Sequence, residues 1–178
     1  FQINASANSA LYPITYLEPM SELNEKVFGL DLASEIVRKD ALHQSFVRAD
    51  ATLSSKINLV QKYVTDHQAG FLIFFPLYQN RDVPSSPEER LHNAKGVIYV
   101  AIDAKKLFEQ LLQSSYILVD FEIYDGVVPS NENLLYNSNT NLVNPRLSHN
   151  VSLELYGKVW TIHFKAQDVL EMSSSRLL

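Results

Sequence analysis

An almost unbroken apolar run, Phe71-Leu-Ile-Phe-Phe-Pro-Leu-Tyr78, constrains the fold more than any other feature of the sequence. Eight residues are too few for most helices, and the aromatic content favours a β-strand buried on both faces. We expect one face to pack on helices and the other to line a concave site. Strand alternation places Phe71, Ile73, Phe75 and Leu77 on one face and Leu72, Phe74, Pro76 and Tyr78 on the other.

A second apolar run, residues 96–103, predicts another buried strand. The polar segment 79–95 between the two runs is predicted to be a loop of 17 residues, long enough to be a lid or a tolerated insertion. Amphipathic helices are expected on either side of these strands. One runs from a cap at Ser34 to about Ala49, and the other spans residues 104–113.

Further alternating segments predict strands over residues 12–18 and 117–124, and a hairpin over residues 151–165 that turns at Gly157-Lys158. Together these elements predict an α+β fold. The helices fall in a larger first unit, residues 12–113. A smaller unit, residues 116–167, is dominated by strands and should pack tightly against the first.

Charge and composition exclude several classes of function. The chain has 15 Lys and Arg against 20 Asp and Glu, a net charge of −5, so we expect no nucleic-acid partner. It has no cysteine, which removes disulfides, thiolate zinc sites and cysteine nucleophiles. No run of 18 apolar residues is present to span a membrane.

Motifs for catalysis are also missing. The sequence has no nucleophile elbow, P-loop or dinucleotide fingerprint, and its five histidines lack metal-ligand spacing. We therefore expect no catalytic residue, metal or cofactor, and classify the chain as a non-enzyme. Asp120 and Glu122 share a strand face and are interpreted as solvated, and Arg38 fits an exposed helix turn.

One carboxylate has a less ordinary setting. Asp31 lies between Leu30 and Leu32, directly after Gly29, in an otherwise apolar stretch. It is either a turn or capping residue, or a buried carboxylate beside a pocket. In the second case it needs a donor, which a ligand amine would supply.

The order and spacing of several motifs in this sequence resemble those of a known family, the CHASE domain. This is the extracytoplasmic sensory module of many histidine kinases and cyclases, plant cytokinin receptors included. The motifs cover about residues 12–113, and the glycine–proline–tyrosine spacing of the long apolar strand is the most specific. The matching residues are Tyr16-Leu-Glu-Pro19, Asn24, Gly29-Leu-Asp-Leu32, Glu35, Arg38, Ala41, Leu59, Gly70 to Tyr78, and Gly96.

The resemblance implies two tandem PAS-like subdomains on antiparallel sheets, with the N-terminal stalk helix largely absent. Residues 12–113 would form the membrane-distal subdomain and residues 116–167 the membrane-proximal one. Residues 1–11 would be a remnant of the stalk, and residues 168–178 a tail towards a membrane helix.

The resemblance also implies a ligand site in the distal subdomain. The family's base-binding Asp falls on Asp31, and a backbone contact after the helix falls near Leu53. Phe74 and Tyr99 stand where cytokinin receptors carry smaller residues, which favours a bacterial source. The implied ligand-binding residues are Asp31, Leu53, Phe74, Tyr78, Tyr99 and Ala101.

Two functions remain open on this basis. The first is a periplasmic ligand-sensing domain of a membrane-bound bacterial signalling protein, such as a two-component kinase or a diguanylate cyclase. Its partner would be an unidentified small molecule, and the parent receptor would be a homodimer anchored by flanking helices. The alternative is a ligand-free structural and dimerisation module whose pocket is filled by its own aromatic side chains.

Overall fold

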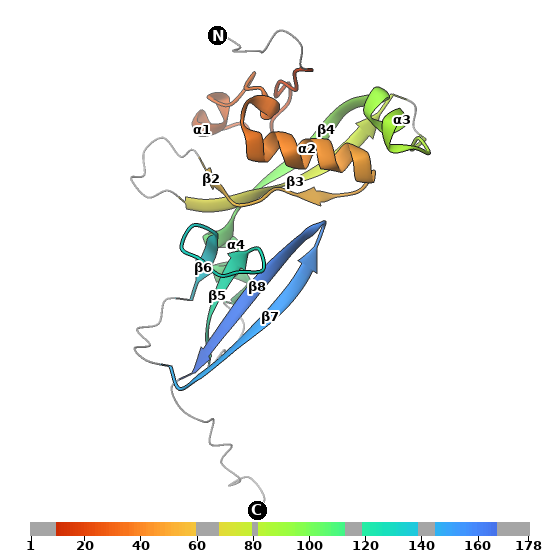
Figure 1. Cartoon of the computed structure of the whole chain (residues 1–178). Coiled ribbons are helices and arrows are strands. Elements are labelled where there is room, and N and C mark those ends of the chain that lie inside the picture. The colour runs from red at the N-terminus through yellow and green to blue at the C-terminus, as the bar shows by residue number, and fades with distance from the viewer. Residues whose placement is uncertain (1–9, 60–67, 80–81, 113–118, 139–144, 167–178) are drawn as a thin grey trace, which may run out of the picture.

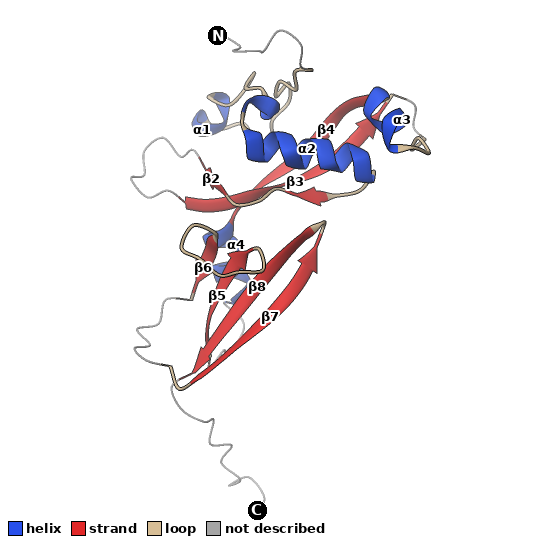
Figure 2. Cartoon of the chain, in the orientation of Figure 1, coloured by secondary structure: helices blue, strands red, loops and turns tan. Residues whose placement is uncertain are grey.

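The structure, a computed structural model, describes residues 10–59, 68–79, 82–112, 119–138 and 145–166. Its strands form two antiparallel sheets, which confirms the predicted α+β class (Figures 1 and 2). The elements are α1 (Glu22–Glu25), a 3-10 turn η1 (Leu32–Ser34), α2 (Ile36–Arg48), β1 (Thr52–Leu53), β2 (Ile57–Leu59), β3 (Gln68–Tyr78), α3 (Pro87–His92), β4 (Ala94–Asp103), α4 (Ala104–Leu112), β5 (Asp120–Asp125), β6 (Leu134–Asn137), β7 (Leu147–Leu155) and β8 (Lys158–Ala166).

The long apolar strand β3 is the centre of the first sheet. It pairs along one edge with β1 and β2 and along the other with β4. Because β3 and β4 are antiparallel, Phe74 lies opposite Tyr99 and Ile73 opposite Val100. The same register therefore fixes which side chains share a face of the sheet.

Helix α2 covers one face of this sheet, as Figure 1 shows. Its apolar side chains pack with Leu72 and Phe74 of β3 in a first core cluster.

Helix α2 begins one residue later than expected, because the Glu35 side chain accepts hydrogen bonds from the backbone N–H groups of Val37 and Arg38. Ser34, the expected cap, ends η1 instead.

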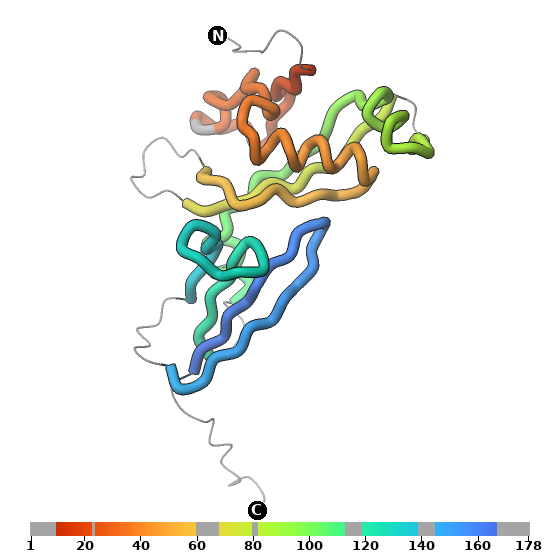
Figure 3. Tube along the Cα trace, viewed as in Figure 1, coloured from red at the N-terminus to blue at the C-terminus, as the bar shows by residue number. Residues whose placement is uncertain are grey.

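A second core cluster lies on the opposite face of the first sheet. Phe71 of β3 packs there on Trp160 of the second sheet, with ring centroids 5.0 Å apart. Helix α4 follows β4 directly and contributes Ala104 and Phe108 to the same cluster. The second sheet has the strand order β6-β5-β8-β7, and Figure 3 shows its trace below the first sheet. The two sheets therefore share one core.

The expectation that both long strands are buried is wrong for part of each strand. Phe75 and Leu77 are each 42% exposed, Ile98 57% and Val100 48%. These four side chains share the face that carries the second cluster. That cluster covers only the part of the face near Phe71, and β4 has no further strand beside it among the described residues.

Two local expectations also need correction. Residues 79–95 are not a continuous loop, because α3 forms within them on a capping box between Ser86 and Glu89. Residues 12–18 form no strand, and only Pro13 makes an isolated bridge, to Asp31. Most of the expected stalk remnant, residues 1–9, and the expected tail, residues 168–178, lie outside the described residues.

Candidate ligand-binding site

Asp31 ties the segment before α2 to the start of the described chain. Its Oδ1 atom accepts hydrogen bonds from the backbone N–H groups of Tyr12 (2.8 Å) and Ala33 (3.0 Å). The capping interpretation of Asp31 therefore holds in the structure. Asp31 also stands close to the Tyr12 phenol, whose pKa is raised first by burial and then by this carboxylate.

Phe74, Tyr78 and Tyr99 lie together under α2. Phe74 is completely buried, and its ring centroid is 6.2 Å from that of Tyr99. The Tyr78 hydroxyl donates a hydrogen bond to the carbonyl oxygen of Phe46 near the end of α2 (2.8 Å), and burial raises its pKa. These aromatic rings, with Tyr12 on Phe46, line the layer between helix and sheet.

The other two predicted residues differ from this group. Leu53 lies opposite Ile73, so its side chain is on the far face of the sheet, in the second core cluster. Its backbone N–H donates to the carbonyl oxygen of Tyr156 (3.1 Å). Ala101 shares a face with Tyr99 but is exposed. The structure thus brings together Phe74, Tyr78 and Tyr99, with the exposed Ala101 two residues further along the same face of β4.

Arg38 is a residue of this layer that the sequence interpretation placed wrongly on an exposed turn. It precedes the buried Ala41 and Leu42 by three and four residues, so it lies on the buried side of α2. Its Nε atom is buried and has no hydrogen-bond partner among the described residues. Burial raises the pKa of the Tyr99 phenol, and the Arg38 cation opposes part of that rise. The helical spacing alone was a sufficient signal to find it.

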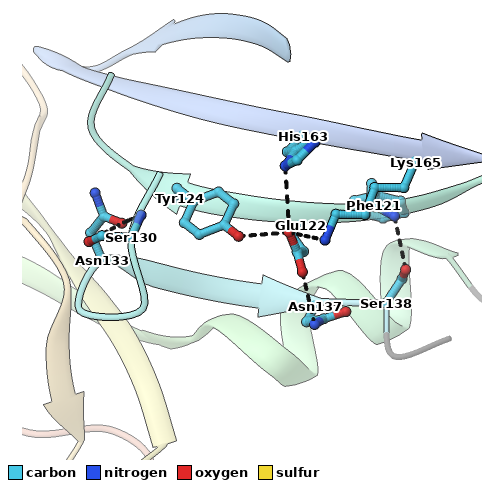
Figure 4. Close-up of polar contacts among 9 residues, drawn as sticks. All are labelled: Phe121, Glu122, Tyr124, Ser130, Asn133, Asn137, Ser138, His163 and Lys165. Atoms are coloured by element: carbon cyan, nitrogen blue, oxygen red, sulfur yellow. Dashed lines mark hydrogen bonds and ion pairs between the residues drawn. The ribbon is translucent and has the colours of Figure 1, made fainter. Parts of the chain in front are cut away.

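A second polar cluster occupies the outer face of the second sheet (Figure 4). The Glu122 carboxylate accepts hydrogen bonds from the Tyr124 hydroxyl (2.7 Å) and from Asn137 Nδ2 (3.2 Å). Lys165 Nζ lies 2.7 Å and His163 Nδ1 3.7 Å from its Oε2 atom. The sequence interpretation of Glu122 as a solvated side chain is therefore wrong. Glu122 is the centre of a network that joins β5, β6 and β8.

The network sets the protonation of its members. Burial alone would raise the pKa of Glu122, but hydrogen bonds from Lys165 and Tyr124, and the Lys165 and His163 charges, lower it below its ordinary value. Burial and the Glu122 carboxylate together raise the pKa of Tyr124 to about 12. At neutral pH the cluster thus holds an ionised Glu122 and a neutral Tyr124.

A small cleft beside α3 shares no residue with the aromatic layer under α2 or with the Glu122 network. That cleft has a volume of about 200 Å³ and is lined by Asp82, Val83, Pro84 and Asn93. In the described part of the chain, every helix is too short or too polar to cross a bilayer.

Comparison with protein families gives the class of the chain. The family model of the CHASE domain matches residues 1–136, which include the whole first sheet, β5 and all but the last residue of β6. The chain belongs to the CHASE domain family. This is a family of extracytoplasmic sensory domains that are not themselves catalytic. A comparison with curated proteins found no match.

Proposed function

We propose that the chain is the periplasmic ligand-sensing domain of a membrane-bound bacterial signalling protein. Family membership supports the sensory role. The observation that carries the proposal further is the aromatic layer between α2 and the first sheet, because it places several predicted ligand residues in one place. Phe74, Tyr78 and Tyr99 would contact the ligand, and Ala101 would mark its entrance.

The strand β3 gives this layer a route to the rest of the molecule. Its neighbouring residues Ile73 and Phe74 face opposite sides, Phe74 towards α2 and Ile73 towards the second sheet. A ligand that repositions the aromatic layer would therefore displace the shared core, since packed interiors transmit strain. Ligand binding would favour one of two packing arrangements, and flanking membrane helices would pass this bias to a cytoplasmic kinase or cyclase domain.

A thermal-shift screen with a broad metabolite panel tests this function. We expect at least one compound to raise the melting temperature of the wild-type domain, and Ala101→Trp to abolish the shift by filling the entrance. Val128→Trp is the matched control, because Val128 is 74% exposed on the second unit. A panel without any shift, or a shift that survives in Ala101→Trp, would contradict the proposed site.

The alternative, a ligand-free dimerisation module, has its own supporting observation. Phe75, Leu77, Ile98 and Val100 form an exposed apolar patch on two paired strands. Such patches often mark protein interfaces, and a second copy of the chain is the occupant that this alternative requires. Sedimentation of wild type against Ile98→Glu separates the alternatives. A dimer dissociated by Ile98→Glu but not by Val128→Glu supports it, and a monomeric wild type refutes it.

A further inference from the structure

We propose that the ligand of the aromatic layer between α2 and the first sheet carries a carboxylate, and that Arg38 is the residue that binds it. This inference rests on the proposed sensing function, and it assigns the chemical class of the ligand. It begins from the Arg38 guanidinium, which presents a buried Nε donor to the layer without a partner among the described residues. A buried unpaired donor is costly, and a charged one more so.

Helix geometry places this donor beside the predicted ligand residues. Arg38 precedes Phe46 by eight residues, about 12 Å along the helix axis. Phe46 is fixed over Tyr78 by the hydrogen bond from the Tyr78 hydroxyl. A distance of about 12 Å along β3 corresponds to about four residues. Four residues before Tyr78 lies Phe74, which is paired with Tyr99, so Arg38 lies over these two rings.

The two carboxylates that precede Arg38 before the start of α2, Glu35 and Asp31, are already engaged, and Asp40 after it is exposed. Both oxygens of Glu35 accept backbone N–H groups at the start of α2, and Asp31 Oδ1 accepts two more. The ion pairs of the described residues include none between Arg38 and either carboxylate. A guanidinium binds a carboxylate in a two-pronged, charge-assisted arrangement, so a ligand carboxylate would satisfy the unused donor.

The surroundings of Arg38 define the rest of the ligand. Phe74 and Tyr99 present aromatic rings, and the neutral Tyr99 phenol is a further donor. Ala101, on the same strand face, is exposed, and the proposed entrance for the ligand lies there. The class that fits is a small carboxylate with an apolar or aromatic body, bound through its charge at Arg38 and through its body on the rings.

Paired probes test the assignment on the intact domain. Benzoate, phenylacetate and 3-phenylpropionate are titrated calorimetrically beside their uncharged amides. We expect at least one carboxylate to bind tenfold or more tightly than its amide. Arg38→Gln should remove this preference, whereas Arg38→Lys should keep part of it. Lys39→Gln removes a charge from the exposed neighbour and should leave the preference intact.

The outcomes of these titrations distinguish a failure of the carboxylate assignment from a failure of the proposed sensing function. Equal binding of acids and amides, or an unchanged preference in Arg38→Gln, overturns the carboxylate assignment. If uncharged metabolites shift the wild type and Ala101→Trp abolishes that shift, the sensing site stands while the assignment falls. No binding by any carboxylate probe also overturns the assignment. Circular dichroism of each variant verifies that a lost preference does not reflect a lost fold.

Discussion

At the scale of single residues, the structure gives Asp31 a defined task that does not depend on a ligand. Its carboxylate accepts the Ala33 N–H at the start of η1 and the Tyr12 N–H, and the second bond adds to the backbone hydrogen bonds that hold residues 12–14 against residues 29–32. The neighbouring aromatic Tyr12 is thereby placed on Phe46. Sequence reasoning left capping and ligand binding open for Asp31, because its chain position alone does not say which donors lie within reach.

We therefore expect Asp31→Ala to lower the free energy of unfolding by about 1–2 kcal/mol, the usual cost of losing a capping side chain. Asp31→Asn keeps an acceptor oxygen and should cost less. Urea denaturation of the three proteins measures both effects. Equal stability of Asp31→Ala and wild type would contradict the capping role.

The Glu122 network makes a prediction about pH. A carboxyl group whose folded pKa lies below its ordinary value of 4.5 stabilises the fold above that pH. The contribution is lost as pH falls through the folded pKa. We expect Glu122→Gln to lower the free energy of unfolding at pH 7 by about 1–2 kcal/mol and to flatten its fall below pH 4.5.

Glu109→Gln is the control for this pH prediction. Glu109 pairs with Lys105 at 3.9 Å on the surface of α4, with its side chain 51% exposed, so its loss should have little effect. Urea denaturation at pH 3 to 7 measures both variants. An unchanged pH profile in Glu122→Gln would show that the network does not stabilise the fold.

At the scale of elements, strand periodicity predicted the first sheet better than it predicted burial. The β3 and β4 positions, α4 and the final hairpin follow from local pattern. The exposure of Ile98 does not follow from local pattern, because this exposure depends on how far the second sheet extends beneath the first. Helix α3 was predictable, since Ser86-Pro87-Glu88-Glu89 combines a capping box with a proline at the first helical position.

Two glycines of the first sheet offer a matched test of its packing. A Cβ at Gly70 would lie 2.6 Å from the backbone oxygen of Ile102, whereas a Cβ at Gly96 would meet nothing within 4 Å. Gly70→Ala should therefore destabilise the domain by about 1–3 kcal/mol. Gly96→Ala should be nearly neutral. Thermal unfolding compares them, and equal melting temperatures would refute the close approach of β3 and β4.

At the scale of the whole molecule, the two sheets are expected to unfold together. Their cores meet at Phe71 and Trp160. Polar links add to this contact, since the Lys56 N–H donates to Asp125 and the Lys158 ammonium to Ser55. The division into two PAS-like subdomains at residues 12–113 and 116–167 remains a prediction from the family resemblance.

Cooperative unfolding is measurable with two probes. Trp160 is the single tryptophan of the chain and lies in the shared core, so its fluorescence reports on that core. Far-UV circular dichroism reports on both sheets. We expect the two urea transitions to coincide. Two separate transitions would mean that the sheets are independently stable units.

The most direct test of the central claim is Trp160 fluorescence during a ligand titration. The claim is that a small molecule bound under α2 changes the core shared with the second sheet. For the best compound from the metabolite screen, we predict a saturable change in Trp160 emission with the same midpoint as calorimetric binding. The change should vanish in Ala101→Phe and persist in Val128→Phe, two variants that leave Trp160 as the single tryptophan. Binding under α2 that leaves Trp160 emission unchanged would contradict the claim.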